Sequence, residues 1–199
     1  MIDTSDSMNE ELIVSVKVGI ETAIETLRKD KLSLDTIHIS FISYNYQANQ
    51  IIPLTKLDSV QMPDLETNGT ARLKSVIPLL LNRINLEVDK GDFYRKADWL
   101  PWVIIISSET FIDDATNYRD LLENASLGGL VIYTVGQCQN DIYFNNSLLR
   151  IESLNNFNNT LLSYIKWVEP WWESTPSRIT DTDVFDFLPP PPNDVFIEI

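Results

Sequence analysis

The first long pattern of apolar residues has helical spacing. Between Met8 and Lys31 an apolar side chain recurs every three or four positions, which places this set on one face of a helix: Leu12, Ile13, Val16, Ile20, Ala23, Ile24 and Leu27. A second helix is predicted from Ala71 to Val88, and Pro78 is expected to kink it or to displace its start. Two later stretches, residues 113–125 and 158–168, predict further helices.

Strand patterns separate these helices. Residues 36–45 alternate between apolar and polar, and residues 50–54 follow after a hairpin-like connection, which together predict an edge ribbon. Residues 102–107 and 130–136 are nearly continuous apolar runs, typical of strands covered on both faces, and residues 148–154 are a candidate last strand. The alternation indicates an α/β sandwich with a mostly parallel central sheet and helices on both faces. Sites in such folds lie beyond the carboxyl ends of the strands.

The globular pattern stops near Trp172. We therefore expect one domain over residues 1–172 and an acidic, proline-rich tail over residues 173–199. The tail contains four consecutive prolines, which favour an extended polyproline II stretch. The alternating segment VFIEI follows and is suited to adding to the edge of a sheet.

Charge restricts the class of partner. The chain has 29 acidic and 15 basic side chains and a formal net charge of -14, so its surface repels nucleic acid and anionic membranes. Cations or basic protein surfaces are the expected partners. The sequence shows no signal-peptide pattern and no apolar run of the about 20 residues that span a bilayer. The single cysteine, Cys138, excludes an internal disulfide, and together these features predict a cytoplasmic protein.

Oxygen-bearing side chains gather where this fold presents its site. Asp3, Ser5 and Ser7 occupy alternate positions just before the first helix, Thr70 precedes the second, and the segment SSETFIDD follows the strand at 102–107. Mg²⁺ prefers oxygen ligands, keeps several waters and is commonly held through one or two carboxylates. These residues therefore form a candidate metal site. The alternative is that the same side chains only cap helices.

The segment DTSDSM resembles the D-x-S-x-S signature of the metal-ion-dependent adhesion site (MIDAS) in von Willebrand factor type A (vWA) domains. The family's second element, typically G-G-T, matches residues 68–70, and its third, typically T-D-G, falls on residues 107–109. More narrowly, the chain is similar to the TerY group of bacterial tellurium-resistance proteins. Segments spread over almost its whole length carry this similarity: IHIS, IIPLTKL, KGD, DW, RIESL, KWV and LPPPP.

The resemblance implies a Rossmann-like vWA fold and a non-enzymatic, cytoplasmic protein-interaction module. Asp3, Ser5, Ser7 and Thr70 would hold Mg²⁺ or Mn²⁺, and an acidic residue of a protein partner would complete the shell of the ion. The partners implied are other tellurium-resistance and stress-response proteins, including kinase and phosphatase components. The oligomeric state stays open.

Three features depart from the family pattern. The strand that normally precedes the aspartate is reduced to Met1 and Ile2, which predicts a groove through the core or exposed strand edges. A start upstream of Met1 is the favoured explanation, before a strand borrowed from a partner or a decaying gene. Ser108 stands where the family usually has an aspartate, which should weaken the hold on a cation. Asp6 and Glu109 replace glycines, and either restore the lost charge or reshape their loops.

Two other functions stay open. A metal-free scaffold of the same fold is consistent with the lost carboxylate at Ser108. A Mg²⁺-dependent phosphotransfer enzyme of the haloacid-dehalogenase type also places an aspartate at a strand end. That chemistry needs a second acid two residues later, and this position is Ser5. The only histidine, His38, has no second histidine or other ligand to complete a cluster and receives no role.

Overall fold

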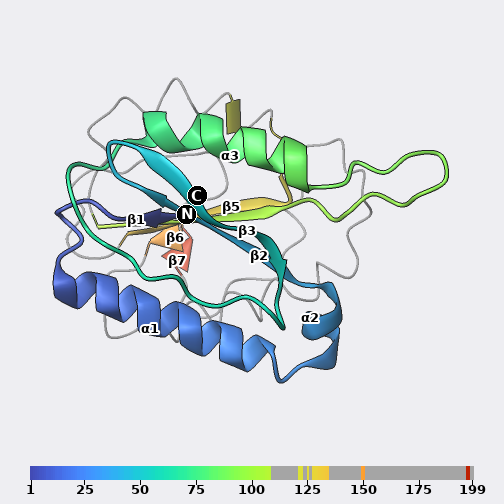
Figure 1. The fold of residues 1–199 in the computed structure, drawn as a ribbon, viewed down its shortest axis with the longest axis horizontal. Coiled ribbons are helices and arrows are strands. Elements are labelled where there is room, and N and C mark those ends of the chain that lie inside the picture. Colours follow the sequence, from blue (N-terminus) through green and yellow to red (C-terminus); the bar gives the residue numbers. More distant parts are fainter. Residues whose placement is uncertain (109–120, 123–124, 126, 135–148, 151–195, 198–199) are drawn as a thin grey trace.

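The computed structural model describes residues 1–108, 121–122, 125, 127–134, 149–150 and 196–197 (Figure 1). Its elements are β1 (Ile2–Asp3), α1 (Glu10–Leu27), α2 (Lys31–Thr36), β2 (His38–Tyr44), β3 (Ala48–Lys56), α3 (Leu73–Glu87), β4 (Trp102–Ser107), β5 (Gly129–Thr134), β6 (Leu149–Arg150) and β7 (Phe196–Ile197). None of the helices in these ranges has the length and apolar character needed to cross a bilayer.

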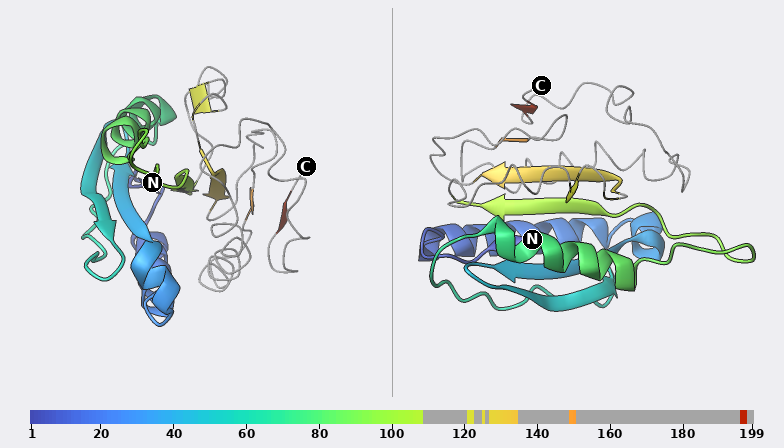
Figure 2. Two further views of the ribbon diagram at one scale, coloured as in Figure 1. Left: turned by 90° about the vertical axis from the view of Figure 1, so that its right-hand side faces the viewer. Right: turned by 90° about the horizontal axis from the view of Figure 1, so that it is seen from above.

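The main sheet has five strands in the order β3-β2-β1-β4-β5. Neighbours from β2 to β5 are parallel, and β3 pairs antiparallel with β2 at the edge, which confirms the predicted edge ribbon. Helix α1 covers one face of the sheet and α3 the other (Figures 1 and 2). The predicted α/β sandwich is therefore confirmed.

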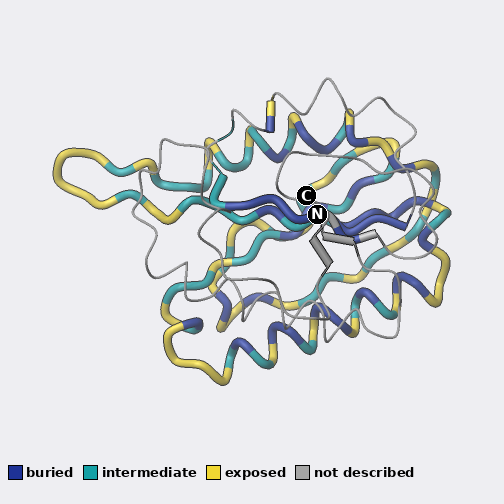
Figure 3. Tube along the Cα trace, turned by 180° about the vertical axis from the view of Figure 1, so that it is seen from behind, coloured by how far each residue is buried: buried dark blue, intermediate teal, exposed yellow. Residues whose placement is uncertain are grey.

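Helix α1 packs through the face that its apolar spacing predicted. All seven residues of that set are buried, and they belong to one cluster with Phe41, Ile106 and Val131 from the sheet. Buried and exposed positions alternate along α1, as expected for a helix that packs through one face (Figure 3). At its start, the side chain of Asn9 accepts a 2.9 Å hydrogen bond from the backbone nitrogen of Leu12, which satisfies one of the free donors of the first turn.

Helix α1 ends at Leu27, before the predicted limit at Lys31. The Arg28 guanidinium reaches across to the carbonyl oxygen of Leu57 at 2.9 Å. Asp30 then caps α2 by accepting a hydrogen bond from the backbone nitrogen of Ser33 at 2.6 Å. The predicted helix therefore ends about one turn early, and α2 is a further short helix that the sequence did not predict.

Helix α3 buries Leu73, Val76, Ile77 and Leu80 on the opposite face of the sheet. It begins at Leu73 rather than Ala71 and continues through Pro78, which is exposed on its outer side. Residues 88–101 then project from the end of α3 before β4 begins (Figure 1).

The structure describes only some of the segments that the sequence predicted after residue 108. Strand β5 begins one residue before the predicted 130–136 segment and ends inside it, and β6 lies within 148–154. In the C-terminal VFIEI segment, β7 pairs antiparallel with β6 in a separate two-stranded sheet. The helix predicted at 158–168, most of the one at 113–125 and the proline run lie outside the described residues.

Strand β1 is central but very short. Ile2 lies opposite Ser43 of β2 and Ile106 of β4, and Asp3 lies opposite Tyr44. Both neighbouring strands begin well before these positions. The groove predicted from the reduced first strand is present as a cavity of about 900 Å³ in front of Met1.

Candidate functional site

Asp3 ends β1 and is fully buried at the carboxyl edge of the sheet. Its Oδ1 accepts a 2.8 Å hydrogen bond from the backbone nitrogen of Ser5. Its Oδ2 accepts a 2.9 Å bond from Ser107 Oγ and a longer one, 3.5 Å, from the backbone nitrogen of Ser108. The carboxylate therefore ties the end of β1 to the end of β4 and is held in one orientation.

Three serine hydroxyls lie next to this carboxylate. Ser5 Oγ and Ser7 Oγ are 2.7 Å apart, and Ser108 Oγ donates a 2.7 Å hydrogen bond to Ser7 Oγ. Ser5 and Ser108 are buried, whereas Ser7 is half-buried. The structure thus brings together Asp3, Ser5, Ser7 and Ser108, which the sequence placed in two distant segments.

The loop that carries Thr70 lies against the loop after β1. The backbone nitrogen of Asn68 donates to the carbonyl oxygen of Thr4 at 2.8 Å, and that of Asp6 donates to Gly69 at 2.8 Å. Gly69 has φ of 69°, a left-handed conformation that glycine adopts without strain. Thr70 itself is exposed, and within the described residues its hydroxyl forms no hydrogen bond with the serines.

Of the two candidate compensating carboxylates, the structure describes only that of Asp6. The side chain of Asp6 is exposed, and only its backbone makes a bond to the Thr70 loop. Glu109 lies outside the described residues. Among the described residues, Asp3 is therefore the carboxylate that belongs to the cluster.

Ser107 belongs to the segment that resembles the family's third element, but no role of its own in the site was predicted for it from the sequence. It is the last residue of β4, is fully buried, and holds Asp3 Oδ2 through its hydroxyl. The available signal was a polar residue closing the apolar run at 102–107, at the edge of the sheet where the site was expected.

The donor set consists of one carboxylate and several hydroxyl groups. Within the described residues, no group of three or more His, Cys, Asp or Glu side chains is placed to hold a metal. A carboxylate offers about four lone-pair positions, so Asp3 keeps acceptor capacity beyond its two short hydrogen bonds. This chemistry fits a hard cation that keeps much of its water, because Mg²⁺ needs only one or two protein carboxylates. It does not fit a carboxylate-rich or nitrogen-rich metal centre.

Comparison with known proteins identifies the family to which the chain belongs. The sequence profile of the von Willebrand factor type A domain matches residues 1–165. The chain belongs to the vWA family. This family consists of protein-interaction modules that are generally non-enzymatic, and a divalent metal is often bound at their MIDAS. No curated protein matches the chain.

Solved structures show the same fold at low sequence identity. The ArnB paralog VWA2 from Sulfolobus acidocaldarius aligns with a TM-score of 0.59 and 15% identity, over 82% of this chain and 43% of that one. Proximal thread matrix protein 1 from the mussel byssus gives 0.53 and 13%, over 81% and 44%. An aerotolerance-related membrane protein from Bacteroides fragilis gives 0.52 and 12%, over 87% and 96%. The chain spans less than half the length of the first two structures.

Proposed function

We propose that this vWA protein is a non-enzymatic interaction module that binds an acidic residue of a protein partner through Mg²⁺ or Mn²⁺. Asp3, Ser5, Ser7 and Thr70 are the proposed ligands. The observation that supports this most directly is the pair of hydroxyls of Ser5 and Ser7, 2.7 Å apart, beside the buried carboxylate of Asp3. The proposed domain covers residues 1–172, with a separate tail over residues 173–199.

Each residue has a distinct part in this mechanism. Asp3 supplies the negative charge, and its bonds from Ser5 and Ser107 keep the carboxylate from turning away. A hydroxyl has two acceptor lone pairs, so Ser7 can accept from Ser108 and still face an ion. The bonds between residues 68–69 and residues 4–6 keep the loop of Thr70 beside the site. When bound, the ion supplies a coordination position that the carboxylate of a partner completes.

The bound ion would also offset part of the protein's negative charge. At a formal charge of -14 the protein repels an acidic partner. A divalent cation bound at Asp3 would offset the negative charges of Asp3 and Asp6 and provide a positive centre for the carboxylate of the partner. The partners we propose are tellurium-resistance or stress-response proteins, kinase or phosphatase components among them, in a TerY-like cytoplasmic setting.

A metal-free scaffold is the second candidate function. The chain of hydrogen bonds from Ser108 through Ser7 to Ser5 satisfies these hydroxyls without an ion. In that case the same surface would bind partners through ordinary polar contacts.

Metal titration distinguishes the two candidates. Chelator-treated protein is titrated with MgCl₂ and MnCl₂ in a calorimeter, beside Asp3→Asn and the matched variant Asp6→Asn. Both variants lose one negative charge from the same loop, but only Asp3 lies in the buried cluster. We expect saturable binding in the parent and in Asp6→Asn, and its loss in Asp3→Asn. Folded protein that shows no heat at millimolar metal would establish the metal-free scaffold.

A further inference from the structure

The segment between α3 and β4, residues 88–101, projects from the body of the protein and is called the arm below. Figure 1 shows it extending past the end of α3. Phe93 and Tyr94 lie midway along the arm, where the chain bends, and are 94% and 91% exposed. Their rings meet edge to face with centroids 5.2 Å apart. Two large apolar side chains exposed together at the end of a projection are typical of a contact surface.

Hydrogen bonds within the arm hold its shape. Asp92 Oδ1 accepts from the backbone nitrogen of Tyr94 at 2.8 Å and from that of Arg95 at 2.9 Å. The outgoing and returning sides are joined at Asp89, whose backbone nitrogen donates to Asp98 Oδ2 at 2.8 Å. The backbone nitrogen of Asp98 donates in return to the carbonyl oxygen of Asp89 at 2.8 Å. Because the free protein already makes these bonds, little further ordering of the arm is needed when it binds.

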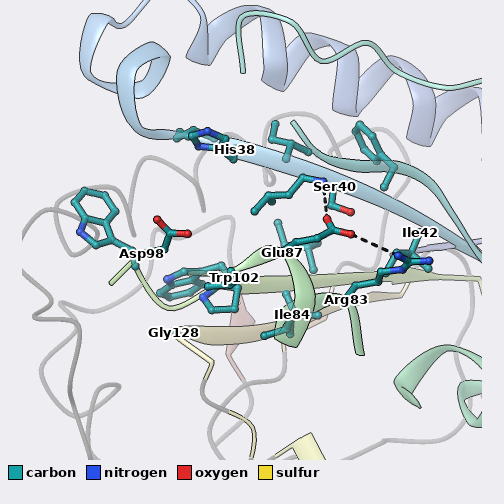
Figure 4. Close-up of a pocket in the computed structure, with 18 of the residues that line it drawn as sticks. His38, Ser40, Ile42, Arg83, Ile84, Glu87, Asp98, Trp102 and Gly128 are labelled. Carbon is teal, nitrogen blue, oxygen red and sulfur yellow. Dashed lines mark hydrogen bonds and ion pairs between the residues drawn. The ribbon is translucent and has the colours of Figure 1, made fainter. Parts of the chain in front are cut away.

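The base of the arm is also held in place. Glu87, the last residue of α3, accepts a 2.7 Å hydrogen bond from the backbone nitrogen of Leu54 in β3 (Figure 4). Its other carboxylate oxygen lies 3.9 Å from the guanidinium of Arg83 in the preceding turn. The end of α3 is thereby tied to the edge of the sheet, so the arm leaves the protein in a defined direction.

The arm differs in charge from the rest of the protein. It has three acidic and three basic residues, so its formal charge is zero in a chain of -14. Its carboxylates all accept hydrogen bonds inside the arm, and Arg95 pairs with Asp89 at 3.0 Å and with Asp92 at 3.3 Å. Lys90 donates only to a neutral asparagine amide of α3, at 2.8 Å, and Lys96 is exposed without a hydrogen bond or ion pair to another described residue. These two ammonium groups are therefore available to the carboxylates of a partner.

The outer face of α1 has the complementary chemistry. Val14 and Val18 lie one turn apart and are 53% and 47% exposed, whereas the other apolar residues of the helix pack on the sheet. The spacing of three and four residues continues on both sides of this pair with exposed glutamates, Glu11, Glu21 and Glu25. These five residues, called the α1 stripe below, form an apolar patch with an acidic residue before it and two after it.

The area of the arm favours a second copy of the chain as the owner of the stripe that it covers. In its own molecule the arm covers nothing with its two rings, because both are almost fully exposed. A two-fold pair of molecules would make the contact twice, once with each arm. At about 150–250 Å² for each buried ring, and a similar area on the covered stripe, four rings bury about 1,200–2,000 Å², the size of a stable protein interface. A single arm provides only about half of this area.

We propose that the arm docks on the α1 stripe of a second copy of this chain, and that two copies exchange arms in this way. The rings of Phe93 and Tyr94 lie on Val14 and Val18 of the other copy. The free ammonium groups of the arm meet the glutamates that flank this apolar pair, so the contact joins opposite charges although both molecules are acidic. This inference does not depend on metal binding.

Sedimentation velocity of the full chain in chelator tests the proposal. The arm variant is Phe93→Ser/Tyr94→Ser, and the stripe variant is Val14→Gln/Val18→Gln. The control, Tyr46→Ser/Ile51→Ser, removes two exposed apolar side chains from β3 and the turn before it. All the replaced side chains are at least partly exposed, and equal Tm values verify that the fold is kept. We expect the parent and the control to dimerise at micromolar concentration, and the Kd to rise at least about tenfold in the arm and stripe variants.

A mixture of the arm variant and the stripe variant tests the pairing itself. A pair of two arm variants, or of two stripe variants, has no intact contact, whereas a mixed pair has one intact arm on one intact stripe. The mixture should therefore associate more strongly than either variant alone. No stronger association in the mixture would overturn the proposal.

Two further outcomes would also overturn it. A parent that stays monomeric up to about 200 µM would show that the arm does not bind a second copy, and would leave a different protein as its partner. A dimer that is weakened in the arm variant and unchanged in the stripe variant would show that the arm binds a surface other than α1.

Discussion

Ser108 Oγ donates a 2.7 Å hydrogen bond to Ser7 Oγ, and this bond joins the end of β4 to the loop after β1. Ser108 therefore makes a structural contact of its own at the position where the family usually has an aspartate. It keeps the hydroxyl cluster connected across two segments that are about a hundred residues apart in the chain. A serine at this position provides a neutral contact in place of the negative charge of an aspartate, and we expect this exchange to weaken the binding of a cation.

Restoring the carboxylate should reverse this exchange. Without metal, Ser108→Asp is expected to lower Tm, because it places a second negative charge beside buried Asp3 and removes the hydroxyl that bonds Ser7. With MgCl₂ it should gain more in Tm than the parent does. Thermal unfolding with and without MgCl₂ measures both effects, and Ser108→Asn serves as the uncharged control. An equal metal-induced shift in all three proteins would contradict this prediction.

The carboxylate of Asp3 should contribute to stability even without an ion. Asp3→Ala leaves the backbone nitrogen of Ser5 and one bond of the Ser107 hydroxyl without their acceptor. We expect a loss of about 1–3 kcal/mol in the free energy of unfolding, measured by urea denaturation in chelator. Asp6→Ala is the control, because Asp6 is exposed. This variant should change the free energy of unfolding by no more than about 0.5 kcal/mol. Similar losses in both variants would argue against a special contribution of Asp3.

The buried amino group of Met1 should make stability depend on pH. Its pKa falls from 8.0 in the unfolded chain to about 5 in the folded protein. Between these values the unfolded chain binds more protons, so the free energy of unfolding rises with pH from about 5 to 8, by at most about 1.4 kcal/mol per pH unit. Acetylation of this amine should abolish that part of the rise. Urea denaturation of acetylated and free protein across this range tests it, and parallel curves would refute it.

Gly69 should be required for the loop that carries Thr70. A Cβ at this position would lie 2.9 Å from Tyr46 Cδ1, and the φ of 69° disfavours a side chain in any case. We expect Gly69→Ala to cost about 1–2 kcal/mol from the backbone conformation alone. Gly91→Ala is the comparison, because Gly91 has a similar φ of 67° but lies in the segment between α3 and β4. Both should lose stability in urea denaturation, but only Gly69→Ala should alter any metal binding measured by calorimetry.

The spacing of apolar residues predicted the helices and strands. A helix buried on one face has apolar residues every three or four positions, and a strand buried on both faces is a continuous apolar run. The buried residues of α1 and the apolar run of β4 are the clearest cases. The vWA resemblance, which rests on DTSDSM and the elements at residues 68–70 and 107–109, is confirmed at the level of the family. The end of α1 was not predictable in this way. It depends on Arg28 reaching Leu57, a contact across the chain that leaves no local pattern.

Part of the proposed site was predictable from neighbours in sequence, and Ser108 was predictable because the carboxyl ends of parallel strands meet at one edge of the sheet. Ser5 and Ser7 come together because side chains at alternate positions of a short loop can point to one side. Ser107 could not be recognised as a partner of Asp3, since a serine at a strand end has the same appearance whether it is buried or solvated. The exposure of Thr70 depends on backbone bonds of the 68–69 loop, which no side-chain pattern records.

The groove beside Met1 also affects how this protein avoids aggregation. A sheet interrupted at its centre has two inner strand edges in addition to its outer ones, and open edges are templates for uncontrolled pairing between molecules. Here α1 and α3 wall the inner edges from both faces. Among the described residues, α1 and α3 therefore shield these inner edges from a second sheet approaching either face. We expect this shielding to limit the edge-to-edge pairing from which fibrils grow.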